Sequence, residues 1–192
     1  FLFYFDQPHL TMAGRELSLE TTRDLINRLV VEGARASIVS SGKRLETIVP
    51  LTADREKLLT GLEKVRDDPR QFESYAMTED GRAAEAARAG VSPTECNGVA
   101  KNYAREEWAE ARRSTQRLGI TVGTLTEVSA PRALVFFGDN LRQAAGLHYL
   151  QLVCPDSAEE LSARMVPSAS AEFDAVINEA LARGVHFFTV QA

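Results

Sequence analysis

The chain has 192 residues, 44% of them hydrophobic and 26% charged, which excludes a disordered chain, a collagen-like repeat and a disulfide-dense mini-protein. Its 27 Asp and Glu outnumber its 22 Lys and Arg, for a formal net charge of −5. The chain is mildly acidic, and it has neither a basic run nor an apolar run long enough to span a bilayer. We therefore expect no nucleic-acid partner and no direct membrane insertion.

The chain opens on Phe1–Asp6 without an initiator Met or a preceding loop, so we expect an internal fragment of a longer protein in which a signal peptide, if there is one, is not visible. The run Leu2–Phe5 is apolar on both faces and predicts a central strand. A helix is predicted from about Arg15 to Val31, ended by Gly33. The expected buried face of this helix consists of Leu17, Thr21, Leu25, Ile26 and Leu29.

The next residues predict a hairpin and a second helix. Two short β-prone runs, Ala36–Ser41 and Leu45–Val49, are joined by a turn at Gly42–Arg44. The helix then extends over Asp54–Val65, with Asp54 at its start as a capping residue.

The middle of the chain, from about residue 71 to 128, predicts helices and no strand, and we interpret it as a mainly helical insertion. A short exposed helix is expected at Glu79–Ala89 and a longer one from near Asn97 to Leu118. The longer helix has a weaker continuation to Val128, because glycines lower its helix propensity. The charge run Arg105–Glu107 is interpreted as part of a solvated helix face.

Strands return toward the C-terminus. Arg132–Phe137 predicts a second apolar strand, and residues 141–170 form an irregular segment in which His148–Val153 is interpreted as a strand and Ser157–Met165 as a short helix. An amphipathic helix at Glu172–Arg183 and an apolar strand at Val185–Val190 follow.

Strands that alternate with helices predict one α/β domain over residues 1–192. We expect a doubly wound, Rossmann-like and mostly parallel sheet flanked by helices, with an antiparallel edge strand from the hairpin. Ligands of such sheets bind beyond the carboxyl ends of the strands. Asp6 and Asp139 each follow a predicted strand, so their carboxylates are candidates to share Mg²⁺ or Ca²⁺. Alternatively, both aspartates merely begin loops or cap helices.

The order of these elements resembles a von Willebrand factor A (VWFA) domain, and most closely a bacterial VWFA-related family of mostly exported, uncharacterised proteins. The matching stretches are Phe1–Asp6, Ala36–Ser41 with Leu45–Pro50, Leu51–Arg55 leading into Leu58 and Leu59, Pro131–Asp139 and Phe173–Val190. The resemblance covers most of the chain except the helical insertion and residues 141–170. It implies a metal-ion-dependent adhesion site at the carboxyl edge of the sheet.

The family's site has the pattern Asp-x-Ser-x-Ser after the first strand, a Thr from a later loop and an Asp after the fourth strand. Through this resemblance, Asp6 and Asp139 match the two aspartates, and Thr78 takes the place of the Thr. Pro8 and Leu10 stand at the two serine positions and cannot ligate a metal. The resemblance therefore implies a degenerate metal site, with Mg²⁺ or Ca²⁺ as its ion.

We therefore expect a non-enzymatic, adhesion-type module that binds a protein partner through the loops at this edge, in an exported protein (periplasmic, cell-surface or secreted). The helical insertion is a second candidate surface. Two alternatives remain: a Mg²⁺-dependent hydrolase or phosphatase using Asp6 and Asp139, and a ligand-free structural subdomain. Cys96 and Cys154 lack metal-ligand spacing and are either two unrelated thiols or one disulfide.

Overall fold

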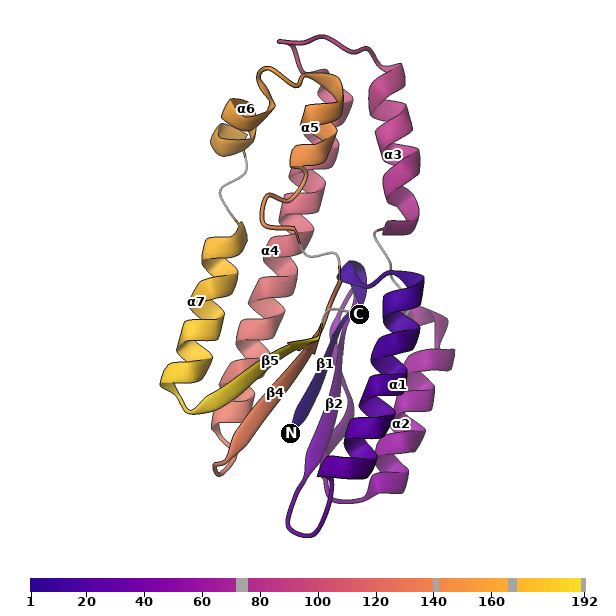
Figure 1. Cartoon of the computed structure of the whole chain (residues 1–192), viewed down its shortest axis with the longest axis vertical. Coiled ribbons are helices and arrows are strands. Elements are labelled where there is room, and N and C mark those ends of the chain that lie inside the picture. Colours follow the sequence, from indigo (N-terminus) through magenta and orange to yellow (C-terminus); the bar gives the residue numbers. More distant parts are fainter. Residues whose placement is uncertain (72–75, 140–141, 166–168, 191–192) are drawn as a thin grey trace.

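Five strands form one mixed sheet in the order β3-β2-β1-β4-β5 (Figure 1), within a computed structural model that describes residues 1–71, 76–139, 142–165 and 169–190. The strands are β1 (Leu2–Asp6), β2 (Ala36–Ser41), β3 (Leu45–Thr52), β4 (Arg132–Phe137) and β5 (Val185–Val190). β1 lies between β2 and β4 and is parallel to both, β5 is parallel to β4, and β2 and β3 form an antiparallel hairpin. The predicted α/β fold with a mostly parallel sheet and an antiparallel edge strand is confirmed.

Helices cover both faces of this sheet, because the side chains of β1 are apolar on both sides. Phe3 and Phe5 pack with α1 (Met12–Leu29) and α2 (Arg55–Asp67) on one face. Leu2 and Tyr4 pack with the C-terminal half of α4 (Gly98–Thr126) and with α7 (Ala169–Ala182) on the other. Two short 3₁₀ helices, η1 (Gln7–His9) and η2 (Pro69–Gln71), complete this part. β1 is thus the buried centre of the sheet.

A group of helices continues beyond the carboxyl ends of the strands, and we call it the helical unit (Figure 1). It consists of α3 (Ala76–Arg88), the N-terminal half of α4, α5 (Leu147–Val153) and α6 (Ala158–Met165). These helices enclose their own apolar cluster around Ala100, Ala104 and Tyr149. Because α4 is one continuous helix of 29 residues, it belongs to both the helical unit and the cover of the sheet.

A disulfide between Cys96 and Cys154 closes the tip of the helical unit. It joins the loop before α4 to the end of α5, and the backbone amide of Ser92 also donates to the carbonyl of Val153 at 2.9 Å. The sequence left open whether Cys96 and Cys154 are two unrelated thiols or one disulfide, and in the structure they form the disulfide.

The interpretation of His148–Val153 as a strand is wrong, because these residues lie in α5. The buried side chains Tyr149, Leu150 and Val153 recur at helical spacing. The helix begins after Gly146, whose φ of 78° is left-handed. A Cβ at Gly146 would lie 2.5 Å from the Cα of Ala104, so glycine permits the close approach of this turn to α4.

The buried face of α1 also differs from the predicted one. Leu17 is 48% exposed, and Ser18 and Thr22 are buried in its place. Both hydroxyls donate to carbonyls one helical turn earlier, Ser18 to Gly14 at 2.6 Å and Thr22 to Ser18 at 2.8 Å. Since the helix itself satisfies these hydroxyls, they can be buried without a partner from the sheet.

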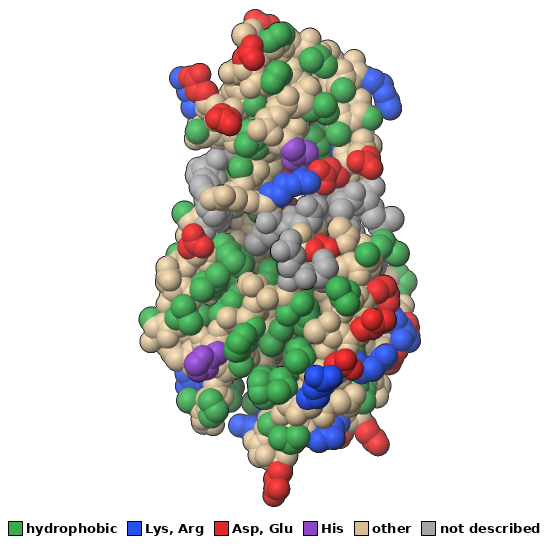
Figure 2. Space-filling model, viewed as in Figure 1, with side chains coloured by type: hydrophobic (Ala, Val, Ile, Leu, Met, Phe, Trp, Pro, Cys, Tyr) green, Lys and Arg blue, Asp and Glu red, His purple; other side chains and the backbone are tan. Residues whose placement is uncertain are grey.

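One part of the sheet remains open. On the edge strand β5, Phe188 pairs with Val135 of β4, yet it is 54% exposed. Near the amino ends of the strands, an apolar groove of about 630 Å³ runs past Phe1, Pro131 and Phe188. Figure 2 shows hydrophobic side chains gathered on this face of the lower half of the molecule. Within the described ranges, no helix has both the length and the apolar character needed to cross a membrane.

Candidate functional site

The carboxyl edge of the sheet brings together polar side chains from four segments. β1 ends at Asp6, and Pro8 in the first turn of η1 ends the strand by turning the chain away. Thr11 then caps α1, its hydroxyl accepting the amide of Gly14 at 3.0 Å. Asp139 follows β4, and Ser114 faces the same edge from α4.

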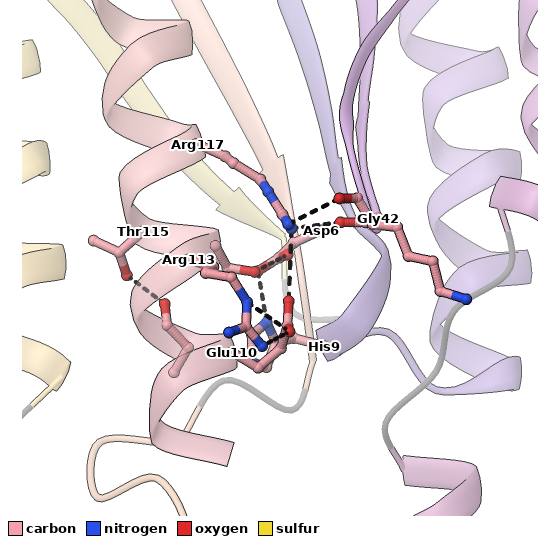
Figure 3. A network of polar contacts seen from close by, with 10 residues as sticks. Asp6, His9, Gly42, Glu110, Arg113, Thr115 and Arg117 are labelled. Carbon is pink, nitrogen blue, oxygen red and sulfur yellow. Dashed lines mark hydrogen bonds and ion pairs between the residues drawn. The ribbon is translucent and has the colours of Figure 1, made fainter. Parts of the chain in front are cut away.

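Asp6 is buried, with 1% exposure, and both of its carboxylate oxygens accept hydrogen bonds (Figure 3). Nδ1 of His9 donates to Oδ2 at 2.8 Å, and the hydroxyl of Ser114 donates to Oδ1 at 2.9 Å. Burial by itself lowers the pKa of His9, but the charge and hydrogen bond of Asp6, with two glutamates of α4, outweigh burial and raise it. Asp6 and His9 therefore form a buried, charge-assisted pair that Ser114 ties to α4.

These three residue types also occur in nucleophilic hydrolases, but their order here is different. In a catalytic triad the serine bonds to the histidine, which removes its proton. Here Ser114 donates directly to Asp6, and the three side chains are at most 6% exposed. The arrangement therefore suits a structural connection between β1, η1 and α4 rather than attack on a substrate.

Asp139 is held by the start of α1. Its Oδ1 and Oδ2 lie 2.9 and 3.1 Å from the backbone nitrogen of Thr11, and the Thr11 hydroxyl also donates to Oδ2. The backbone amide of Asp139 in turn donates to the carbonyl of His9 at 2.9 Å. A negative side chain at a helix N-terminus is stabilised by the unpaired amides and the helix dipole. Asp139 thus fastens the end of β4 to α1.

Of the three candidate metal ligands, Asp6 and Asp139 lie at the carboxyl edge of the sheet, whereas Thr78 lies on α3 in the helical unit. Asp6 faces His9 and Ser114, Asp139 faces Thr11, and the side chain of Thr78 is exposed on α3 in the helical unit. Pro8 and Leu10, at the two serine positions, are both buried.

The donor chemistry of this edge fits a metal ion poorly. Each aspartate already accepts N–H and O–H donors of the chain, and these donors compete with a metal ion for the carboxylate oxygens. Among the described residues, no group of three or more His, Cys, Asp or Glu is arranged to hold a metal ion. We therefore derive no chemistry through Mg²⁺ or Ca²⁺ at this edge.

The next turns of α4 extend the polar network toward the hairpin (Figure 3). The guanidinium of Arg117 donates to the carbonyl oxygens of Gly42 and Lys43 in the turn between β2 and β3. Glu110 lies near Arg117 at 3.6 Å and pairs with Arg113 at 2.5 Å. α4 is therefore anchored both to the end of β1 and to the hairpin turn.

A second polar cluster lies where the helical unit meets the sheet, and we call it the waist cluster. It consists of Glu79 on α3, Glu107 on α4, Arg142 before α5 and His148 on α5. Arg142 lies 2.6 Å from an oxygen of Glu79 and 3.5 Å from one of Glu107. Nε2 of His148 lies 3.1 Å from Glu79 and 3.7 Å from Glu107.

The interpretation of the α4 charge run as solvated is confirmed for Arg105 and Glu106, which are exposed, and is wrong for Glu107, which is only 5% exposed. Burial raises its pKa, against the opposing effects of the Gly146 amide and the nearby Arg142. The four members come from segments far apart in the chain, and no local motif connects them. The charged residues around Glu107 in the sequence do not indicate that Glu107 is buried while Arg105 and Glu106 are exposed.

No protein-family profile matches the chain, and no curated protein matches its sequence.

Proposed function

We propose that this chain is a non-enzymatic protein-binding module, similar to a VWFA domain, that works without a metal ion. The observation that carries this proposal is the internal pairing of the carboxyl edge. Asp6 is 1% exposed, and the carboxylate oxygens of both Asp6 and Asp139 accept hydrogen bonds from donors of the chain itself. A hydrolase or phosphatase would need a reactive carboxylate open to substrate at this place.

Two further features support binding to a protein. The helical unit lies beyond the carboxyl ends of the strands, where adhesion-type loops would present a surface, and exposes Val91 and Leu152 near the disulfide. The disulfide also supports the proposal of an exported protein, because disulfides persist in oxidising compartments.

Metal dependence is tested by calorimetric titration of the purified chain with Mg²⁺, Mn²⁺ and Ca²⁺. We expect no saturable heat up to millimolar ion. A site that Asp6→Asn abolishes, and that the exposed-residue control Asp24→Asn leaves intact, would overturn metal-free binding. The same three proteins are assayed with a generic phosphoester. Turnover lost only in Asp6→Asn would instead identify an enzyme.

Binding itself is tested by capture from the exported protein fraction of the source organism, with and without a chelator. We expect a saturable protein partner whose capture is independent of the chelator. Val91→Glu at the tip of the helical unit and Phe188→Glu on the open face map the contact. Ile120→Glu, which changes an equally exposed side chain on α4, is the matched control. Absence of any saturable partner would favour a ligand-free structural subdomain.

A further inference from the structure

A polar pocket of about 400 Å³ lies at the tip of the helical unit, beside the disulfide. One wall is the loop before α4 with the first turn of that helix, including Cys96 and Lys101, and the other is the beginning of α6, including Ser157 and Leu161. The hydroxyl of Ser157 donates to the carbonyl of Thr94 at 2.9 Å and joins the two walls. Small-molecule sites in proteins have volumes of roughly 300–1,000 Å³, so this pocket is large enough for a small compound.

The two cysteines of the disulfide differ in their access to this pocket. Cys96 lines the pocket and is 7% exposed, whereas Cys154 is 0% exposed and lies in the apolar cluster of the helical unit with Leu150 and Val153. A disulfide is opened by a thiolate that attacks one of its two sulfurs, and the rate depends on access to that sulfur. A compound in the pocket therefore meets Cys96 and not Cys154.

The surroundings of Cys154 suit the sulfur that leaves in such an exchange. Its Sγ lies 3.1 Å from the carbonyl oxygen of Leu150, one helical turn earlier. In the disulfide this sulfur carries no hydrogen, but a reduced Cys154 can donate its S–H to that carbonyl. Apolar surroundings favour the neutral thiol over the thiolate. A thiol formed at Cys154 is thus hydrogen-bonded, and it is a poor nucleophile for closing the disulfide again.

The pocket also offers one positive and one negative group that have no partner in the described part of the chain. These groups are the ammonium of Lys101 and the carboxylate of Glu95. The other two charged residues at the pocket, Glu160 and Arg164, pair with each other at 2.5 Å. A compound that carries both a carboxylate and an ammonium group complements the charges of Lys101 and Glu95.

We propose that this pocket is a thiol–disulfide exchange site for small zwitterionic thiols of the amino-acid type, in which Cys96 is the sulfur attacked and Cys154 is the sulfur that leaves. The thiolate of the entering compound attacks Sγ of Cys96, an S–S bond forms between them, and the bond to Cys154 breaks with its electron pair on Cys154. The proton lost by the entering thiol ends on Cys154. A second thiol then displaces Cys96 from the mixed disulfide, so two small thiols are oxidised to a small disulfide while the protein disulfide is reduced. This exchange is independent of the partner binding proposed above.

The choice of sulfur is tested by treating the intact, oxidised chain with a limiting amount of the amino acid cysteine, quenching with acid and mapping the peptides by mass spectrometry. We expect the added cysteine to be attached to Cys96 and a free thiol to appear at Cys154. The chain unfolded in urea is the control and should be labelled at both positions, because access then no longer differs. Equal labelling of the folded chain, attachment mainly to Cys154, or no mixed disulfide at all would overturn the proposal.

The charge assignment is tested by the rates at which cysteine and the neutral thiol 2-mercaptoethanol open the disulfide, each divided by its rate with the urea-unfolded chain. We expect a preference for cysteine of roughly fivefold, the value of one or two exposed ion pairs. Lys101→Gln and Glu95→Gln should each reduce this preference, whereas Lys57→Gln, at an exposed lysine of α2, should leave it unchanged. No preference in the wild type, or one that survives in both pocket variants, would overturn the zwitterionic class of thiol.

Discussion

The hydrogen bond from Ser114 to Asp6 offers a direct measure of how strongly α4 is tied to the sheet. Ser114→Ala removes one donor to a buried carboxylate, a contact between residues 108 positions apart at 2.9 Å. Hydrogen bonds to charged groups contribute about 1.5–3 kcal/mol, and alanine returns at most about 0.5 kcal/mol of helix propensity. We expect a loss of about 1–2.5 kcal/mol in the free energy of unfolding.

The neighbouring residue supplies the control. The hydroxyl of Thr115 is equally buried, but it donates to the carbonyl of Ala111 in the same helix at 3.0 Å. Thr115→Val removes this hydroxyl with little change in shape, and because no tertiary contact is lost, it should cost less than about 1 kcal/mol. Both variants are compared by urea unfolding of the oxidised chain, as shifts of the midpoint at constant slope.

The comparison distinguishes a tertiary hydrogen bond between α4 and β1 from a hydrogen bond within α4. If Ser114→Ala is no more destabilising than Thr115→Val, the contact with Asp6 does not hold α4 to the sheet. A double-mutant cycle with Asp6→Asn then isolates the pair, and we expect a coupling of about 1 kcal/mol. A coupling near zero would refute the reasoning even if both single variants were unstable.

Three further predictions concern the same edge and the helical unit. Gly14→Ala should destabilise the chain by about 1–2 kcal/mol, because the added Cβ would lie 2.0 Å from Oδ2 of Asp139. Gly123→Ala, which has open space around the added Cβ, should stabilise the chain by about 0.5–1 kcal/mol. The urea midpoints of the two variants check both values. Reduction of the disulfide, which spans 58 residues, should lower the free energy of unfolding by up to about 4 kcal/mol, measured by urea unfolding with and without reductant. Because the pKa of His9 is raised, its pairing with Asp6 stabilises the fold below pH 6.5, and this contribution is lost as the pH rises. The difference in the free energy of unfolding between wild type and His9→Gln should therefore become smaller from pH 6 to pH 9. A difference that grows over this range contradicts the pairing.

The sheet could be predicted because its strands have a local signal. The runs at β1 and β4 are apolar on both faces, which only a strand covered on both sides satisfies. The face of α1 could not be predicted in the same way. The helix buries Ser18 and Thr22, and a rule based on hydrophobic periodicity assigns such residues to solvent.

The candidate site shows the same limit more strongly. Asp6 and Asp139 were found from their places after strands, and they do lie at the carboxyl edge. Their partners were not found, because Ser114 lies in a distant helix and its neighbours on α4 are charged like any solvated face. Glu107 was missed for the same reason. Whether a polar residue is buried depends on the residues that pack against it, and these residues cannot be identified from the sequence next to it.

The continuous helix α4 also changes what the helical insertion can do. As an insertion predicted from sequence it could move as a body, but α4 contributes Leu118 and Val122 to the core of the sheet and Ala100 and Ala104 to the helical unit. The helical unit is therefore continuous with the cover of the sheet through α4 and shares one rigid element with it. The disulfide joins the loop before α4 to the end of α5 at the tip, while the waist cluster joins α3, α4 and α5 at the opposite end.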